Sequence, residues 1–413
     1  MRSQQVVRDD GAMSLPATPR WRDLPEPVAH RLRAQRGGEA IGLYLHVPFC
    51  ASRCGYCDFN TYTAGELGSS SSPQSWSEAV RRELDGAADL LGSRPVSTVF
   101  VGGGTPSLLG AAGLADLLAA VRNSFRLAPG AEVTTESNPE STSPEFFDAI
   151  RAAGYTRVSL GMQSASSHVL AILDRTHTPG RPAAAAREAA AAGFDHINLD
   201  VIYGTPGETD TDLDVTLDAV LAAPVDHVSA YALIVEDGTA FARKVRRGEI
   251  AAPDDDVLAT RYERVNERLC AAGFDWYEVS NWGRGTDSAC RHNEAYWRSE
   301  DWWGIGPGAH SHVGGARWWN RKHPASYASA LSEARWPGDG FEVLTERDVH
   351  VEALMLRLRM RSGLPASLLA DDERTRAEEA VRSDLLRFAG GAYVLTDRGR
   401  LLADGVVRQL LVD

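Results

Sequence analysis

Three cysteines lie within eight residues of this 413-residue chain, and their types and spacing suggest chemistry more directly than any other residues. Cys50, Cys54 and Cys57 have the spacing C-x3-C-x2-C, and the next cysteine is Cys270. Iron–sulfur clusters are held by cysteine thiolates, and a [4Fe-4S] cluster normally takes four protein ligands. Three thiolates therefore predict a cubane cluster that leaves one iron open to an exchangeable ligand.

An open iron suits S-adenosylmethionine, whose amino and carboxylate groups can chelate it. An electron from the cluster can then cleave the S–C bond of the sulfonium and release a carbon radical, which is cofactor rather than side-chain chemistry. Two alternatives stay open. A structural zinc site usually has four ligands, and His46 and Asp58 lie nearby in the sequence. A disulfide framework is weaker still, because disulfides are rare in cytosolic proteins and the 5 cysteines are an odd number.

The composition indicates an ordinary soluble globular protein, with 43% hydrophobic and 24% charged residues. The net charge of −13 argues against a nucleic-acid-binding protein, which usually carries a basic footprint. No apolar run approaches the roughly 18 residues of a membrane span, and residues 1–38 lack the apolar core of a signal peptide. We expect a cytoplasmic protein with a flexible leader over residues 1–40, in which Met13 is an alternative start to Met1.

Short apolar, β-branched runs alternate with helical patterns over the first part of the chain. The predicted strands cover residues 41–47, 96–102, 132–136, 157–162, 196–202 and 227–233. The predicted helices cover residues 76–91, 113–125, 144–153, 182–192 and 210–222. Strands joined by helices in this way predict an α/β fold with a parallel sheet and right-handed crossovers. Six strands are too few to close an eight-stranded barrel.

Polar and glycine-rich segments follow the ends of these strands. They are the cysteine loop after Val47, the GGGTP segment 102–106, the ESNP segment 136–139, the GMQS segment 161–164, and Asp200 with residues 203–207. In barrels of this kind, functional residues gather at the C-terminal ends of the strands, so these segments predict one common site. The three glycines allow a ligand to approach the backbone closely, although a tight strand-to-helix turn would use them equally well.

The alternation stops after about residue 240. Residues 254–272 have a helical pattern, and residues 274–279 have a strand pattern. Residues 276–336 then hold eight of the ten tryptophans. Residues 345–360 and 374–388 are helical by spacing, and residues 391–395 form a short strand pattern. We divide the chain into a core domain over residues 41–275, an aromatic-rich linker segment over residues 276–340 and a C-terminal domain over residues 341–413.

The cysteine loop resembles that of radical S-adenosylmethionine enzymes. The sequence YLHVPFC from Tyr44 to Cys50, followed by Cys54, Cys57 and Asp58-Phe59, looks most like two related groups. These are the oxygen-independent coproporphyrinogen III oxidases and their paralogues, the HemW-type heme chaperones, and the resemblance runs from about residue 41 to the C-terminus. The oxidases carry a further cysteine two residues after the third, where this chain has Phe59, and this difference favours the chaperone group.

The resemblance implies a fold, two cofactors and a set of site residues. The fold is an open, partial (β/α)6 barrel of the TIM type with a smaller α+β C-terminal domain that is similar to a winged helix. Cys50, Cys54 and Cys57 would hold the [4Fe-4S] cluster. The positions that match S-adenosylmethionine-binding residues are Tyr44, Tyr56, Gly103, Gly104, Thr105, Glu136, Gln163, Arg175 and Asp200. Carboxylates can balance the sulfonium and bind ribose hydroxyls, and an arginine can pair with the methionine carboxylate.

The segment HNEAYW at residues 292–297 resembles the H-N-x-x-Y-W motif of the heme-chaperone group. Histidine is a common axial ligand of heme iron, so His292 is the heme candidate, with His310, His312 and Cys290 as rivals. Basic residues among the tryptophans could pair with the porphyrin propionates, and they are Arg317, Arg321 and Lys322. The alternatives are that the tryptophans form the core of a small subdomain or, less well supported, that they stack on nucleic-acid bases.

The function implied by this resemblance is that of a heme chaperone, which binds heme and transfers it to an acceptor protein. The alternatives are a coproporphyrinogen III oxidase, which is a radical decarboxylase, and another radical S-adenosylmethionine enzyme on the same barrel, since fold alone does not determine function. Whether the protein is an enzyme therefore stays open. The implied partners are heme, an unknown heme acceptor and an electron donor such as a flavodoxin or ferredoxin. Peripheral membrane association through a partner is also compatible with heme delivery, and no nucleic acid is expected.

Overall fold

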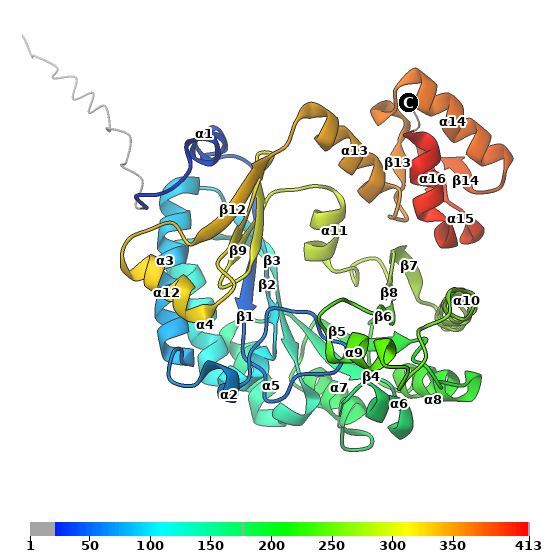
Figure 1. The fold of residues 1–413 in the computed structure, drawn as a ribbon, viewed down its shortest axis with the longest axis horizontal. Coiled ribbons are helices and arrows are strands. Elements are labelled where there is room, and N and C mark those ends of the chain that lie inside the picture. The colour runs from blue at the N-terminus through cyan, green and yellow to red at the C-terminus, as the bar shows by residue number, and fades with distance from the viewer. Residues whose placement is uncertain (1–20, 176, 412–413) are drawn as a thin grey trace, which may run out of the picture.

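Six parallel strands form the middle of the main sheet in the computed structural model, which describes residues 21–175 and 177–411 (Figure 1). They are β1 (Ile41–Val47), β2 (Val96–Gly103), β3 (Leu127–Ser137), β4 (Arg157–Gln163), β5 (His196–Tyr203) and β6 (His227–Ala232). Each pairs in parallel with the next strand along the chain. The predicted α/β fold with an open six-stranded parallel barrel is confirmed. Among these six strands, the largest difference from the predicted bounds is that β3 begins at Leu127 rather than at residue 132.

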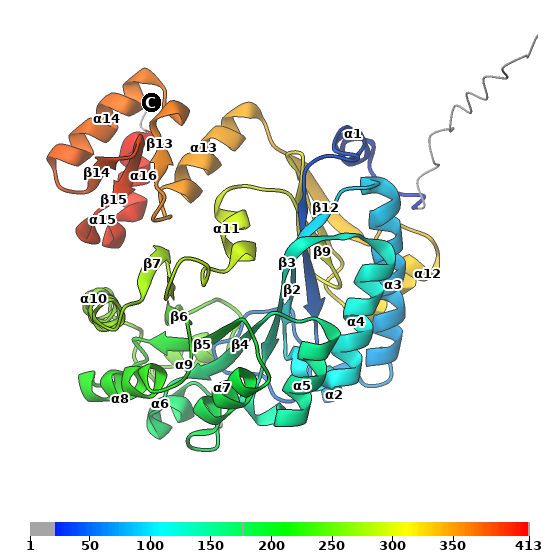
Figure 2. The same ribbon diagram turned by 180° about the vertical axis from the view of Figure 1, so that it is seen from behind.

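Helices connect these strands and cover the outer side of the sheet (Figure 2). They are α2 (Ala64–Leu67), α3 (Pro73–Leu91), η1 (Pro106–Leu109), α4 (Gly110–Ser124), η2 (Pro139–Ser141), α5 (Pro144–Ala153), α6 (Ser167–Ile172), α7 (Arg181–Ala191) and α8 (Asp210–Leu221). The hydroxyls of Ser72, Ser143 and Thr209 each accept a backbone N–H from the first turn of α3, α5 and α8, and such N-caps explain where these helices begin. Along residues 21–175 and 177–411, no helix combines the length and the apolar character that crossing a membrane requires.

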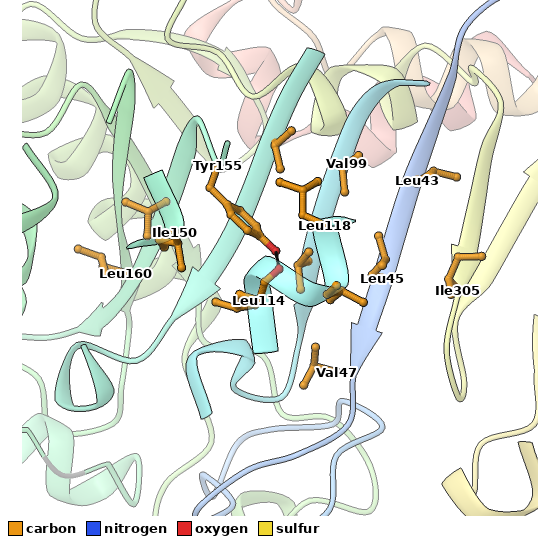
Figure 3. Close-up of a cluster of buried hydrophobic side chains, with 14 of the residues drawn as sticks. Leu43, Leu45, Val47, Val99, Leu114, Leu118, Ile150, Tyr155, Leu160 and Ile305 are labelled. Carbon is orange, nitrogen blue, oxygen red and sulfur yellow. Dashed lines mark hydrogen bonds between the residues drawn. The ribbon is translucent and has the colours of Figure 1, made fainter. Parts of the chain in front are cut away.

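The alternation of side chains along each strand separates the core from the site. Leu43, Leu45 and Val47 of β1 are buried against the helical layer, where they pack near Leu114 and Leu118 of α4 (Figure 3). Successive side chains of a strand point to opposite faces, so Tyr44 and His46 point to the inner face of the barrel. The same alternation places Asn198 and Asp200 of β5 on that inner face. The inner face is therefore polar, while the outer face is apolar.

Further strands extend the sheet beyond both edges of the parallel part. Next to β1 lie β9 (Trp302–Ile305), β10 (His310–Val313), β11 (Ala316–Asn320) and β12 (Gly338–Val343), and next to β6 lie β8 (Asn281–Gly283) and β7 (Asp275–Glu278). Strand β9 runs parallel to β1, and β8 runs antiparallel to β6. Residues 276–340 are thus not a linker in this structure. Trp303 and Trp318 are buried in the main core of the molecule, and not in the core of a separate small subdomain.

The part of the predicted leader that the structure describes is ordered against the core. Helix α1 (Glu26–Ala34) buries Val28 and Leu32, and Trp21 is buried beside them. The prediction of a flexible leader is therefore wrong for residues 21–40, because these apolar side chains lie on one face of a helix. Residues 1–20, with Met1 and Met13, lie outside the described part of the chain.

The remaining elements belong to the second half of the chain. They are α9 (Ala240–Arg246), α10 (Asp255–Ala271), α11 (Arg291–Trp297), α12 (Pro324–Ser332), α13 (Glu346–Arg357), β13 (Leu364–Pro365), η3 (Ala366–Leu368), α14 (Asp371–Arg382), β14 (Leu386–Ala389), β15 (Ala392–Leu395), α15 (Asp397–Leu401) and α16 (Ala403–Leu410). The last of these elements form a smaller α+β region with its own core and a three-stranded antiparallel sheet. Its Arg400 guanidinium lies 4.5 Å from the ring centre of Trp276 in β7, which joins the region to the barrel.

Candidate functional site

The loop after β1 carries the three clustered cysteines. All three are free thiols and are half-buried. The backbone of the loop is held by hydrogen bonds, with Cys50 N donating to Tyr62 O at 3.0 Å and Cys57 N donating to Cys54 O at 3.2 Å. Among residues 21–175 and 177–411, no three His, Cys, Asp or Glu side chains are close enough to hold a single metal ion. In a four-iron cluster the three thiolates would bind different irons.

Hydrogen-bond donors point at two of the sulfur atoms. Arg175 Nη1 donates to Cys54 Sγ at 3.3 Å, and Thr105 Oγ1 donates to Cys50 Sγ at 3.8 Å. Burial raises the pKa of the Cys50 and Cys57 thiols, whereas donors to sulfur favour the thiolate that a metal requires. Sulfur is a soft ligand, and two of these sulfur atoms accept hydrogen bonds that favour the thiolate form. Both properties fit an iron–sulfur cluster.

The glycine-rich end of β2 supports the cysteine loop. Gly104 N donates to Val47 O at 2.7 Å, and Thr105 N donates to Phe49 O at 2.8 Å. Gly103 N donates to Glu136 Oε2 at 3.0 Å, with its φ at 110°. These three N–H groups are therefore engaged within the protein, and the role of Gly103, Gly104 and Thr105 in holding the cofactor stays a prediction. The segment fixes the cysteine loop and the carboxylate of Glu136.

Replacing Gly104 by alanine is expected to displace the cysteine loop. A Cβ at this position would lie 2.5 Å from Phe49 O and 3.0 Å from Cys50 Sγ. The backbone must shift to accommodate it, at a cost of about 1–3 kcal/mol in the free energy of unfolding. Iron and sulfide per chain after anaerobic reconstitution should fall as well. Gly65→Ala in α2 is the control, because a Cβ there meets no atom within 4 Å. Equal iron contents in the two variants would contradict the role assigned to Gly104.

Two half-buried carboxylates lie on the inner face, with Glu136 near the end of β3 and Asp200 in the middle of β5. Burial, and then the nearby charge of Asp200, raises the pKa of Glu136 to about 8 against the opposing hydrogen bond from Gly103. Burial likewise raises the pKa of Asp200 to about 6, although Ser159 Oγ and Asn198 Nδ2 donate to it at 3.1 and 2.7 Å. Each carboxylate would ionise more readily beside a cationic ligand. The pair therefore fits the sulfonium and amino groups of S-adenosylmethionine.

The other predicted cofactor-binding positions surround these carboxylates. Arg175 Nη2 donates to Gly161 O at 3.3 Å, and a Cβ on Gly161 would lie 3.1 Å from Gln163 Nε2. Tyr56 is mostly buried, and burial followed by the charge of Cys54 raises its pKa. The predicted positions are linked through contacts or charge interactions around the inner face, and they are Tyr44, Tyr56, Gly103, Gly104, Thr105, Glu136, Gln163, Arg175 and Asp200.

The HNEAYW segment forms α11, which lies between the β2–β3 part of the sheet and β7 in both ribbon views (Figures 1 and 2). His292 is 2% exposed. Its Nδ1 lies 2.8 Å from Thr98 Oγ1, and its Nε2 lies 2.9 Å from Tyr296 Oη. Burial lowers its pKa to about 3, so the ring is neutral. Both ring nitrogens are hydrogen-bonded, so an iron at His292 would have to break one of these bonds.

The rival heme ligands differ in exposure. His310 is exposed and stacks on Trp319 with 5.9 Å between ring centres, whereas His312 is mostly buried against Trp302. Cys290 is buried, and burial raises its pKa.

The basic side chains expected at the propionates are partly neutralised within the protein. Arg317 pairs with Glu342 and Glu352 at 2.9 and 2.8 Å. Arg321 lies 4.0 Å from Asp339. A propionate would therefore compete with these carboxylates for the two guanidinium groups.

Asn60 is a site residue that the sequence analysis missed. Its Nδ2 donates to Pro307 O at 3.0 Å and to Lys322 O at 2.8 Å, and its carbonyl oxygen lies 2.9 Å from His46 Nε2. These bonds tie the cysteine loop to the segments that follow β9 and β11. The glycines beside Pro307 were a usable signal, because a Cβ on Gly308 would lie 2.6 Å from Asn60 Nδ2.

The fold and this arrangement define a radical S-adenosylmethionine protein. The family model described as the Radical SAM superfamily matches residues 44–220. Coproporphyrinogen III oxidase (HemN) from Escherichia coli, described as a radical SAM enzyme, has a TM-score of 0.81 over 94% of this chain and 93% of that chain. At 22% sequence identity, this likeness shows the shared fold.

Curated relatives identify the family more closely. The heme chaperone HemW of Mycobacterium tuberculosis is 62% identical over 374 residues, which cover 91% of this chain and 95% of the relative. The heme chaperone HemW of Escherichia coli is 31% identical over 389 residues, which cover 90% and 98%. The chain belongs to the HemW family, as the cysteine loop and the HNEAYW segment predicted.

Proposed function

We propose that this protein is a heme chaperone, which binds heme and transfers it to an acceptor protein. The observation that carries this proposal is the 62% identity to a heme chaperone over 91% of the chain. Phe59 supports it, because an exposed phenyl group (59% exposed) stands where the related oxidases have a further cysteine.

The proposal includes a [4Fe-4S] cluster on Cys50, Cys54 and Cys57 and an exchangeable S-adenosylmethionine. The donors at the sulfur atoms support the cluster, and the carboxylates of Glu136 and Asp200 support the S-adenosylmethionine. When bound, the cluster supplies an electron to the sulfonium cofactor. The chain's own residues would orient and desolvate the two groups. Arg175 would donate to a sulfur atom of the cluster, and Glu136 and Asp200 would face the positively charged groups of S-adenosylmethionine.

For heme, the structure supports His310 rather than His292 as the iron ligand. His310 is exposed beside Trp319, whose flat ring suits a porphyrin face, whereas the nitrogens of His292 are already bonded. We expect His310→Ala to lose most of the Soret absorbance of a heme-titrated sample and His292→Ala to retain it. Iron and sulfide contents should match the wild type in both. Loss of the Soret absorbance in His292→Ala but not in His310→Ala would identify His292 as the heme-iron ligand.

One anaerobic experiment separates the chaperone from the oxidase alternative. The reconstituted full chain is titrated with heme and, in a second aliquot, incubated with coproporphyrinogen III, S-adenosylmethionine and a reductant. We expect a Soret band that saturates, with no protoporphyrinogen formed. Turnover to protoporphyrinogen would overturn the proposal and favour the oxidase, for which the fold alone offers support at 22% identity.

The proposed partners are heme, a heme-acceptor protein and an electron donor such as a flavodoxin or ferredoxin, in the cytoplasm. Delivery to a membrane-bound acceptor would bring the protein to the membrane surface through that partner. The acidic net charge of −13 supports the expectation that nucleic acid is not a partner.

A further inference from the structure

The guanidinium group of Arg175 is fixed by three hydrogen bonds. Its Nε donates to His177 Nε2 at 2.9 Å, its Nη1 donates to Cys54 Sγ at 3.3 Å, and its Nη2 donates to Gly161 O at 3.3 Å. The planar fork of an arginine has fixed donor directions, so fixing Nε sets the direction of both terminal nitrogens. His177 therefore determines where Nη1 points.

The environment of His177 keeps its Nε2 atom as a hydrogen-bond acceptor for Arg175. Its side chain is 3% exposed, and Nε2 can accept from Arg175 only when its proton is on Nδ1. Within the described part of the chain, Nδ1 has no hydrogen-bond partner, and it lies 4.0 Å from Glu140 Oε1. Glu140 is itself held by Thr178, whose backbone N donates to it at 2.7 Å. Burial and then the charge of Arg175 lower the pKa of His177 to about 4, so the ring stays neutral.

Asp200 on β5 also attracts the guanidinium group of Arg175. Its charge acts on Arg175 less strongly than that of Cys54 does. An arginine side chain has about 2 kcal/mol of rotamer entropy, and without a fixed Nε the guanidinium group can adopt other orientations. The hydrogen bond to the sulfur would then be lost for part of the time.

We propose that His177 is a positioning residue that aims Arg175 at Cys54 Sγ and thereby raises the reduction potential of the cluster. The inference rests on the proposed cluster at Cys50, Cys54 and Cys57. Hydrogen bonds to the sulfur atoms and the net charge nearby set the potential of iron–sulfur clusters, and a donor stabilises the more negative, reduced state. Neither the family match nor the cysteine spacing assigns a role to His177.

The test is a reductive titration of the reconstituted full chain, followed by EPR, in four variants. His177→Leu removes the acceptor, and His177→Asn keeps a polar group that reaches only as far as Nδ1. Both should have a more negative midpoint potential than the wild type. His177→Gln places an amide oxygen near Nε2 and should restore the wild-type potential. His168→Leu, at an exposed histidine on α6 that pairs with Asp212, is the control and should leave the midpoint potential unchanged.

A double variant tests the path through Arg175. Arg175→Lys keeps the charge but has no Nε–H, so adding His177→Leu to it should not lower the potential further. Equal potentials in all His177 variants, or a His177→Gln potential as low as that of His177→Leu, would overturn the positioning role while leaving the proposed function intact. If His177→Leu takes up no iron, the midpoint potentials of His177→Asn and His177→Gln are compared instead, and equal potentials would overturn the positioning role. A wild-type protein without a cluster would overturn both the proposed function and this inference.

Discussion

The Cys57→Ser protein, reconstituted anaerobically, is expected to bind markedly less iron and sulfide than the wild type. The three thiols lie in one loop, and each would hold a different iron, so losing one sulfur ligand leaves a cluster with two open corners. Serine is similar in size but is a hard oxygen ligand with a far weaker preference for iron–sulfur chemistry. Iron and sulfide analysis, with the visible absorbance of the cluster, measures the effect.

Cys270→Ser is the matched control for this experiment. Cys270 is an exposed thiol on α10, and no contact joins it to the cysteine loop in the described structure. It should bind as much iron as the wild type. Unchanged iron and sulfide in Cys57→Ser would contradict the assignment of this cysteine as a ligand.

The second large effect is expected from Glu83, a fully buried carboxyl group on α3 (0% exposed). It accepts hydrogen bonds from Tyr327 Oη at 2.5 Å, Gly306 N at 2.8 Å and Asn320 Nδ2 at 2.8 Å. Glu83→Ala would leave these donors buried without a partner. We expect the free energy of unfolding to fall by at least about 3 kcal/mol, since each such donor costs about 1–3 kcal/mol. Urea unfolding measures this change.

Glu83 also gives a pH dependence of known sign. Burial raises its pKa from 4.5 to about 7 in the folded protein. A raised carboxyl pKa contributes stability that is fully present below the unfolded pKa and is lost as the pH rises through the folded pKa. The free energy of unfolding of the wild type, minus that of Glu83→Gln, should therefore be larger at pH 5 than at pH 8. Glu78→Gln, on the exposed face of α3, is the control, and an equal difference at both pH values would contradict the assignment.

The parallel part of the fold was predictable from local patterns. Each of the six strands is a short apolar run between helical stretches, and β1 and α5 have the bounds that the sequence indicated. Because the C-terminal ends of parallel strands meet at one edge, the positions of Glu136 and Asp200 followed from the order of the elements. The positions of Tyr56 and Arg175 lie outside strands and came from the family resemblance alone.

The strands of the aromatic segment were not predictable in the same way. Strands β8 to β11 are three to five residues long and too short for a clear alternation, and β9 pairs with β1 from the other end of the barrel. The roles of Asn60 and Glu83 were missed for the same reason, because their hydrogen-bond partners lie far away in the sequence, within residues 306–327. His292 was predicted as a heme ligand because its hydrogen-bond partner Thr98 lies on β2, far from α11 in the sequence.

The tether at Asn60 has a consequence for the order of folding. The loop with the three cysteines is made early in synthesis, yet it is anchored to the carbonyl groups of Pro307 and Lys322. Contacts between such distant segments form slowly, because the intervening chain must first be ordered. The ribosome has therefore released most of the barrel before the cysteine loop can reach its final shape, and we expect iron to be inserted into a nearly complete polypeptide.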